Sequence, residues 1–150
     1  MSEASPSPVS CRAGTAADAA SIAEFIESFV AGGKLLRRTL QELNELLPNG
    51  FVAEADGQIV GFAALEIYSP KLAEIRSLAV SEEFRRFGVG RDLVARCVEL
   101  AQENNVLEVM AVTSTDAFFR SCGFDYTLPG ERKALFIQTR DSSDQNGSTQ

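Results

Sequence analysis

The segment LAVSEEFRRFGVGRDL, residues 78–93, decides the interpretation of the fold. It ends an apolar, strand-like run, crosses a polar connection that contains two glycines, and enters a helical pattern near Val89. Glycines let backbone amides turn toward a ligand, and a helix start adds free N–H groups and the positive end of a dipole. Because Arg85, Arg86 and Arg91 flank these groups in an acidic chain, the segment predicts an anion site rather than a plain tight turn.

The residues around the glycines narrow the class of anion. A Walker loop requires lysine and then serine or threonine after its last glycine, whereas Arg91 and Asp92 follow Gly90. A dinucleotide fingerprint requires a third glycine at the position of Leu93. The sequence therefore supports neither ATP nor NAD as the ligand.

Composition limits the architecture and the class of protein. A chain of 150 residues with 45% hydrophobic content is expected to form one core. It has neither a secretion signal nor an apolar run long enough to span a bilayer, so we expect a cytoplasmic protein with no membrane partner. A net charge of −7 argues against a nucleic-acid partner, since that affinity comes mainly from neutralising phosphates.

The content of histidine and cysteine excludes several kinds of catalytic site. With no histidine, the chain has no Ser-His-Asp or Cys-His nucleophile system, and we expect no metal site. The three cysteines, Cys11, Cys97 and Cys122, are odd in number and far apart, which is typical of reduced thiols. Proton transfer therefore falls to carboxylates, tyrosine or water.

Apolar spacing predicts alternating strands and helices on both sides of the anion segment. We expect a single domain at 10–140 between disordered tails at 1–9 and 141–150, because the tails carry few apolar residues. Capping-box spacings precede two N-terminal helices, and Asp56 with Gly57 suits a hairpin turn. The expected strands are 11–13, 51–55, 59–67, 73–80, 107–112 and 134–139, and later helices begin near residues 89 and 116.

Two motifs carry a family resemblance. Residues 85–90 match the pattern R/Q-x-x-G-x-G/A, and residues 117–124, AFFRSCGF, are similar to a later aromatic signature that ends in Gly-Phe. With the order of elements from Arg12 to Phe124, these motifs resemble the GNAT superfamily of N-acetyltransferases. The resemblance implies an α/β (α+β) fold with a mixed, mostly antiparallel sheet, flanked by helices and splayed at a cleft for acetyl-coenzyme A as co-substrate.

The resemblance also implies which residues hold the cofactor. The backbone of Leu78, Ala79 and Val80 would bind the pantetheine arm, and an N–H of Leu78 or Ala79 would polarise the thioester carbonyl. Phe118 and Phe119, in the second motif, are further candidates, although we expect at least one of them in the core. Backbone amides would hold the pyrophosphate, with arginines beside them, in a seat that comprises Arg85, Arg86, Phe87, Gly88, Val89, Gly90 and Arg91.

Amine acetylation requires a neutral nitrogen, so a base must remove a proton before or during direct attack in a ternary complex. In relatives that resemble this stretch, a glutamate at the position of Glu74 is that base. Strand alternation places Glu74 on one face with Arg76 and Leu78. The alternative is a structural carboxylate paired with Arg76, and Glu66 is the second candidate base.

One catalytic position of the family is changed in this chain. Many members have a tyrosine that protonates the departing thiolate, and here Phe119 stands in its place. The thiolate can instead take a proton from water, because a thiol with a pKa of about 8.5 is a tolerable leaving group. Tyr68 and Tyr126 are the other possible donors.

Three segments bear on the acceptor amine. Residues 33–40, 72–80 and 128–136 are similar to the acetyltransferase domain of N-acetylglutamate synthases, although Arg37 stands where those relatives have proline. The resemblance favours an acidic amino acid such as glutamate, whose carboxylates would need charge-assisted bonds from Arg38, Arg76, Arg132, Lys133 and Arg140. The alternatives are another small amine, a protein N-terminus, or a regulatory module that binds coenzyme A without turnover. A homodimer is the default oligomer.

Overall fold

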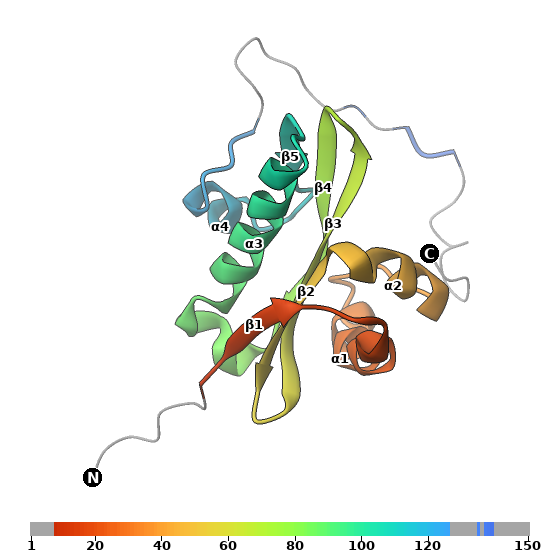
Figure 1. Ribbon diagram of the computed structural model, residues 1–150, viewed down its shortest axis with the longest axis vertical. Coiled ribbons are helices and arrows are strands. Elements are labelled where there is room, and N and C mark those ends of the chain that lie inside the picture. The colour runs from red at the N-terminus through yellow and green to blue at the C-terminus, as the bar shows by residue number, and fades with distance from the viewer. Residues whose placement is uncertain (1–7, 127–134, 136, 140–150) are drawn as a thin grey trace.

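The computed structural model describes residues 8–126, 135 and 137–139 (Figure 1). Its strands are β1 (Ser10–Ala13), β2 (Gly50–Ala55), β3 (Gln58–Ser69), β4 (Leu72–Val80) and β5 (Glu108–Met110). Its α-helices are α1 (Ala19–Ala31), α2 (Leu40–Leu46), α3 (Val89–Glu103) and α4 (Asp116–Ser121). Short 3-10 helices precede α1, follow α2 and precede α3, at η1 (Ala16–Asp18), η2 (Leu47–Asn49) and η3 (Glu82–Phe87). The predicted order of elements is confirmed through α4.

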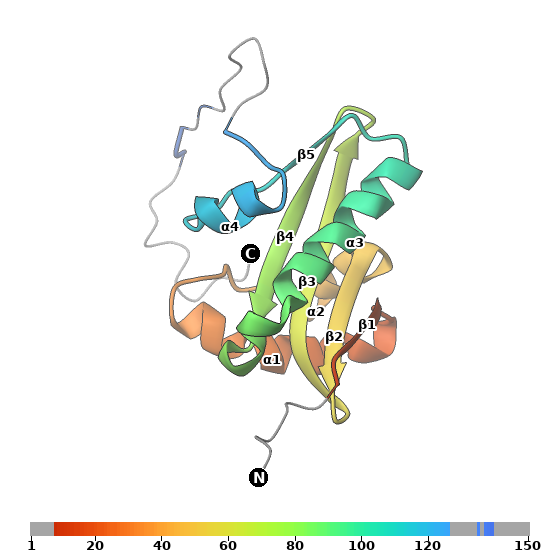
Figure 2. The same cartoon turned by 90° about the vertical axis from the view of Figure 1, so that its left-hand side faces the viewer.

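The five strands form one sheet with helices on both faces. The strand order is β1-β2-β3-β4-β5, antiparallel from β1 to β4 and parallel between β4 and β5. Helices α1 and α2 cover one face, over a core that includes Ile22 and Phe62 (Figures 1 and 2). Helices α3 and α4 cover the other face, over a core that includes Leu93 and Phe119. The predicted mixed, mostly antiparallel α/β architecture is confirmed.

Local sequence explains how the early elements begin and turn. Thr39 Oγ1 accepts the Glu42 amide at 3.0 Å, and Glu42 Oε1 accepts the Thr39 amide at 2.8 Å. This reciprocal cap satisfies two amides at the start of α2. At the β2–β3 turn, Asp56 and Gly57 adopt φ angles of 53° and 76°, which a two-residue hairpin of this kind requires. Both features confirm the predictions from spacing.

Strand β4 contains a bulge at Ser77 that was not predicted. Ala64 of β3 pairs with Arg76, whereas Phe62 pairs with Ala79, so β4 contributes one residue more than β3 between these pairs. Ser77 has a φ of 59°, in the left-handed region. An extra residue of this kind leaves the ladder locally unpaired and changes the direction of the strand.

The bulge shifts the alternation of side chains along β4. Ala73 and Ile75 face the α3 core before the bulge, and Leu78 and Val80 face the same core after it. The prediction that Leu78 shares a face with Glu74 is therefore wrong. Strict alternation fails here because one inserted residue inverts the order of the two faces.

The sheet opens between β4 and β5. The two strands pair only through Leu72, Ala73 and Glu74, opposite residues 108–110. From Ile75 to Val80, β4 has no partner on its β5 side among the described residues. The splay predicted beside the end of β4 is confirmed, and it leaves the backbone of this segment open to a ligand.

The chain after the splay departs from the prediction. Strand β5 is three residues long, shorter than the predicted 107–112, because it diverges from β4. The described part of the predicted strand 134–139, Leu135 and 137–139, lies outside any strand. Leu135 is almost fully exposed, so this apolar pattern meets no described surface to pack on. The predicted C-terminal tail and most of the N-terminal one lie outside the described residues, and the domain limits 10–140 stay a prediction.

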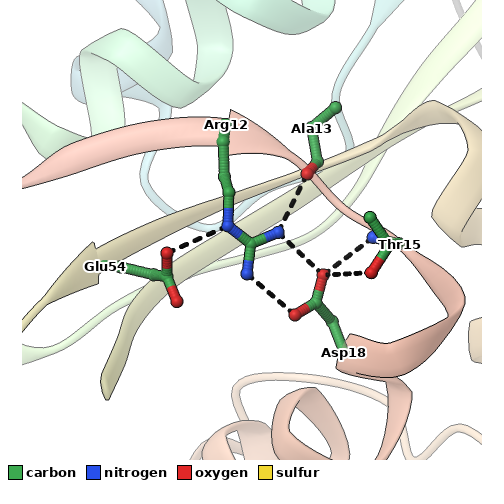
Figure 3. A network of polar contacts seen from close by, with 5 residues as sticks. All are labelled: Arg12, Ala13, Thr15, Asp18 and Glu54. Atoms are coloured by element: carbon green, nitrogen blue, oxygen red, sulfur yellow. Dashed lines mark hydrogen bonds and ion pairs between the residues drawn. The ribbon is translucent and has the colours of Figure 1, made fainter. Parts of the chain in front are cut away.

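A salt-bridge network fixes the N-terminal strand to the first helical turn (Figure 3). The Arg12 guanidinium donates two bonds of 2.8 Å to Asp18 and one of 2.9 Å to Glu54 of β2. Asp18 also accepts the Thr15 amide at 2.7 Å, and its side chain is only 13% exposed. Arg12, and to a smaller degree Thr15, hold the pKa of Asp18 well below its usual range. The network therefore joins β1, β2 and η1.

We expect Asp18→Asn to lower the free energy of unfolding by about 1–2 kcal/mol at neutral pH, because it removes a charged acceptor of four hydrogen bonds. Since folding depresses the pKa of Asp18, its stabilisation is present above the ordinary carboxyl value and is lost as the pH falls. The stabilities of parent and variant should therefore converge below about pH 4. Denaturant titrations at several pH values measure this. Glu24→Gln, on the exposed side of α1, is the control, and equal stability of Asp18→Asn and parent at neutral pH would contradict the prediction.

Candidate active site

The predicted anion seat lies where β4 leads into α3. Residues 82–87 form η3, a tighter structure than the open loop expected from the sequence. Gly88 then adopts a φ of 77°, and α3 begins at Val89 and runs for 15 residues. The first amides of α3 have no partner within the helix, so they and the helix dipole favour an anion at this end.

The three arginines of the seat differ in the hydrogen bonds that their side chains make. Arg85 donates from Nε to the carbonyl of Val80 at 3.2 Å. Arg91 donates to the Ser121 carbonyl at 2.9 Å and to Ser121 Oγ at 3.1 Å, so its side chain ties α3 to α4. Arg86 is exposed and makes no hydrogen bond to a described residue. Two of the predicted cations therefore support the fold of the seat, and Arg86 is the most available to a ligand.

Helix α4 brings an aromatic ring onto the seat. A Cβ on Gly90 would lie 3.2 Å from the ring of Phe118, closer than side chains ordinarily pack. Phe119 is 7% exposed and belongs to the α3 core, where its ring packs edge-on against Phe118 and Phe124. Phe119 thus lies in the core, as expected for at least one of the two phenylalanines. Phe118 stays at the edge of the splay.

Four side chains form a polar cluster, the Glu74 cluster, on the α1–α2 face of β3 and β4. Glu66 and Glu74 stand directly opposite each other across the two strands. Arg76 donates to Glu66 at 2.7 Å and to the Tyr68 hydroxyl at 3.0 Å, and its Nη1 lies 3.7 Å from Glu74. Tyr68 donates to Glu74 at 2.5 Å. Arg76 thus offsets the repulsion between two facing carboxylates.

Arg38 approaches this cluster from the segment between α1 and α2. Its Nε is buried and has no hydrogen-bond partner among the described residues. Burial, and next the charge of Arg76, lowers the pKa of the Arg38 guanidinium, while Glu42, Glu66 and Glu74 act in the opposite direction. The structure therefore holds a partly buried cation beside Glu74 with donor capacity left over.

A cavity of about 240 Å³ lies between α2 and β3 beside this cation, lined in part by Arg38, Glu42, Asn49 and Glu66. A larger cavity of about 550 Å³ lies between the end of α1 and the start of η3. That cavity includes Arg85, but no member of the Glu74 cluster lines it. The smaller cavity is therefore the candidate site for an acceptor, because Arg38 and Glu66, one member of the Glu74 cluster, line it.

Of the cations predicted to bind the acceptor, the structure brings Arg38 and Arg76 close to Glu74. Arg132, Lys133 and Arg140 lie outside the described residues. Tyr126 donates to Asp116, far along the chain from the Glu74 cluster, and Tyr68 donates to Glu74. The three cysteines are free, and burial raises the pKa of Cys97 to about 12.

Sequence reasoning missed two features of the site. One is the contact between Tyr68 and Glu74, although Glu66 and Tyr68 are two residues apart on a strand and so share a face. The other is the left-handed conformation of Ser77, for which a serine in an apolar strand gives no local signal. Among the described residues, no group of three or more potential ligands could hold a metal ion, and no helix has the length and hydropathy to span a bilayer.

Comparisons with known proteins agree with this geometry. The model of the acetyltransferase (GNAT) family matches residues 21–124. An uncharacterized N-acetyltransferase of Chlorobaculum tepidum is 41% identical over 108 residues, which are 72% of this chain and 70% of that protein. An amino-acid acetyltransferase of Aeromonas salmonicida is 31% identical over 137 residues, which are 87% of this chain but only 31% of the longer enzyme.

Solved structures give the same result. A Mycobacterium tuberculosis protein in complex with coenzyme A superposes with a TM-score of 0.72 at 25% identity, covering 93% of this chain and 82% of that one. N-acetylglutamate synthase from Neisseria gonorrhoeae, complexed with coenzyme A and N-acetyl-glutamate, has a TM-score of 0.74 at 26% identity. That match covers 95% of this chain and 32% of the synthase. The chain therefore belongs to the GNAT family of acetyl-coenzyme A-dependent N-acetyltransferases.

Proposed function

We propose that this acetyltransferase acts on the α-amino group of a free amino acid, with glutamate as its preferred acceptor. The observation that carries the proposal is Arg38, a partly buried guanidinium with an unpartnered Nε beside Glu74. A carboxylate is the partner that such a cation binds most strongly. Relatives named amino-acid acetyltransferase, and a synthase structure that holds N-acetyl-glutamate, support the same acceptor.

The residues of the splay fit the cofactor. Acetyl-coenzyme A supplies the acetyl group as a thioester and leaves as the thiol. The start of α3 would hold its pyrophosphate through free amides, and the missing side chain of Gly90 lets the Phe118 ring lie against this first turn. Leu78 lies in the bulge, outside the β3–β4 register. An amide of Leu78 or Ala79 would donate to the thioester carbonyl oxygen, where negative charge grows during transfer.

Glu74 is the base in this proposal. Its side chain is 12% exposed and stands one residue away from the segment that β5 leaves unpaired. It would take a proton from the acceptor ammonium, so that the nitrogen lone pair forms a bond to the carbonyl carbon as the bond to sulfur breaks. Glu66 is the second candidate, but Arg76 already holds its carboxylate at 2.7 Å. With Phe119 in the core, the thiolate would take its proton from water.

The cations around the site have different roles in this proposal. Arg76 was predicted to bind substrate, yet its Nη1 is committed to Glu66 and Tyr68. Arg38 is therefore the first candidate for the acceptor carboxylate among the described residues. Arg132, Lys133 and Arg140 stay candidates for a second carboxylate by sequence alone. A homodimer also stays a proposal.

We expect saturating acetyl-coenzyme A to stabilise the parent protein by about 2.7 kcal/mol at a hundredfold excess over its dissociation constant, whereas ATP and NAD do not. Gly90→Val should abolish the shift in thermal unfolding, because the side chain enters the space between Phe118 and the first turn of α3. Gly57→Ala is the control: a Cβ there meets no atom within 4 Å, so strain lowers stability while the shift remains. A parent protein that does not respond to acetyl-coenzyme A would refute the proposed cofactor site.

Glu74→Gln keeps the shape of the side chain and removes its basicity, so turnover should fall roughly 100-fold or more. The thermal shift with acetyl-coenzyme A should stay near that of the parent, since the cofactor seat is elsewhere. Thiol release measured across the pH range tests this, with Glu99→Gln, an exposed carboxylate of α3 that lines neither cavity, as the control. If Glu66→Gln lost turnover and Glu74→Gln kept it, Glu66 would be the base.

Arg38→Gln should reduce kcat/KM for glutamate by about thirtyfold, the equivalent of one charge-assisted pair of about 2 kcal/mol, and change glutamine less if Arg38 binds the side-chain carboxylate. Arg37→Gln is the matched control, because Arg37 is exposed and pairs with Glu27 at 3.0 Å. Specificity constants for glutamate, glutamine, leucine and a short peptide measure both effects. A parent enzyme that clearly prefers the peptide or leucine would rule out glutamate.

A further inference from the structure

The Tyr68 hydroxyl occupies the centre of the Glu74 cluster. It lies 2.5 Å from Glu74 Oε1, 3.0 Å from Arg76 Nη1 and 3.4 Å from Glu66 Oε1. Tyr68 lies two residues after Glu66, near the end of β3, and the residue is 48% exposed. Three charged side chains therefore surround one hydroxyl group, which is unusual for a surface tyrosine at the end of a strand.

We propose that Tyr68 is a positioning residue for Glu74: its hydroxyl holds Glu74 Oε1 and leaves Oε2 for the proton of the acceptor ammonium. This inference rests on the proposed function, in which Glu74 is the base. It assigns Tyr68 a different role from proton donation to the departing thiolate.

The direction of the hydrogen bond follows from the donors present. Arg76 can only donate, so the Tyr68 oxygen accepts from it and must use its own proton elsewhere. The contact to Glu74 is 0.9 Å shorter than the contact to Glu66, from 3.4 Å minus 2.5 Å, so the proton points to Glu74. Burial, and next the Glu74 carboxylate, raises the pKa of Tyr68 to about 12, which keeps the hydroxyl protonated wherever an amine can be acetylated.

The charged groups near Glu74 show why the hydrogen bond from the Tyr68 hydroxyl matters to this carboxylate. The charged groups around Glu74 and Arg38 are the cation Arg76 on β4 and the carboxylates Glu66 on β3 and Glu42 on α2. Arg76 is nearer to Glu66 than to Glu74, at 2.7 Å against 3.7 Å. Tyr68 is therefore the closest donor that the Glu74 carboxylate has among the described side chains. Without it, the Glu74 carboxylate would keep only the 3.7 Å contact to Arg76, directly opposite the Glu66 carboxylate.

Tyr68→Phe isolates the hydroxyl, since the ring and its packing remain. We expect the acidic limb of the kcat/KM profile to move to higher pH, with a loss of roughly tenfold below the limb and recovery toward the parent at alkaline pH. A merely structural role would lower the profile evenly. In the Glu74→Gln background the same substitution should add no further change, because Tyr68 acts through Glu74. A Tyr68→Phe profile that superimposes on the parent, or an equal loss in both backgrounds, would overturn the proposal.

A second measurement needs no turnover and so separates this inference from the proposed function. The chain has two tyrosines and no tryptophan, so in the Tyr126→Phe protein the ultraviolet absorbance of tyrosinate reports Tyr68 alone. We expect Tyr68 to titrate at about 12, and Glu74→Gln to lower that pKa only in part, because burial is its largest cause and remains in the variant. Titration near the ordinary value in both proteins would overturn the contact even if the enzyme were active. A pKa of Tyr68 that falls in Glu74→Gln, with no acetyl transfer by the parent, would keep the contact and refute the proposed function instead.

Discussion

The bulge at Ser77 is the constraint on which the rest of the site depends. One extra residue in β4 allows the strand to keep apolar side chains in the α3 core at both ends while Glu74 and Arg76 face α1 and α2. A regular strand would have placed Leu78 and Val80 on the polar face or Glu74 in the core. The left-handed φ of Ser77 costs on the order of 1 kcal/mol or more, and the surrounding pairing holds it in place.

The same irregularity explains why the sheet opens where it does. A strand that leaves the ladder register on one side also changes direction, and β5 follows β4 only as far as Glu74. The end of β4 thus offers unpaired backbone on its β5 side and leads directly into η3 and the free amides of α3. Under the proposed function, one strand and its following turn would supply the backbone for the acyl carrier, the anion seat and the catalytic carboxylate.

Much of this arrangement could be predicted from sequence because its signals are local. Capping residues such as Thr39, the turn at Asp56 and Gly57, and the glycines before α3 each act through neighbouring backbone, so spacing alone identifies them. The bulge could not be predicted, since Ser77 adopts its conformation through pairing with β3 rather than through its own chemistry. For the same reason strict alternation assigned Leu78 to the wrong face. The ion pair between Arg76 and Glu66 depends on the β3–β4 register, so composition and spacing could not predict it either.

The two arginines beside Glu74 illustrate how one kind of residue serves two purposes. Arg76 lies on the strand itself, between two carboxylates that face each other, so its charge is neutralised within the fold. Arg38 lies outside the sheet, and its Nε is buried without a described partner, which ordinarily costs about 1–3 kcal/mol. Under the proposed function, a ligand carboxylate would supply the missing acceptor, and binding would recover this cost. The same binding step would bring the acceptor nitrogen toward Glu74, whose charge already acts on the Arg38 guanidinium. Recognition of the acceptor and removal of its proton would then depend on one cluster of charges, held between α2 and the bulged strand.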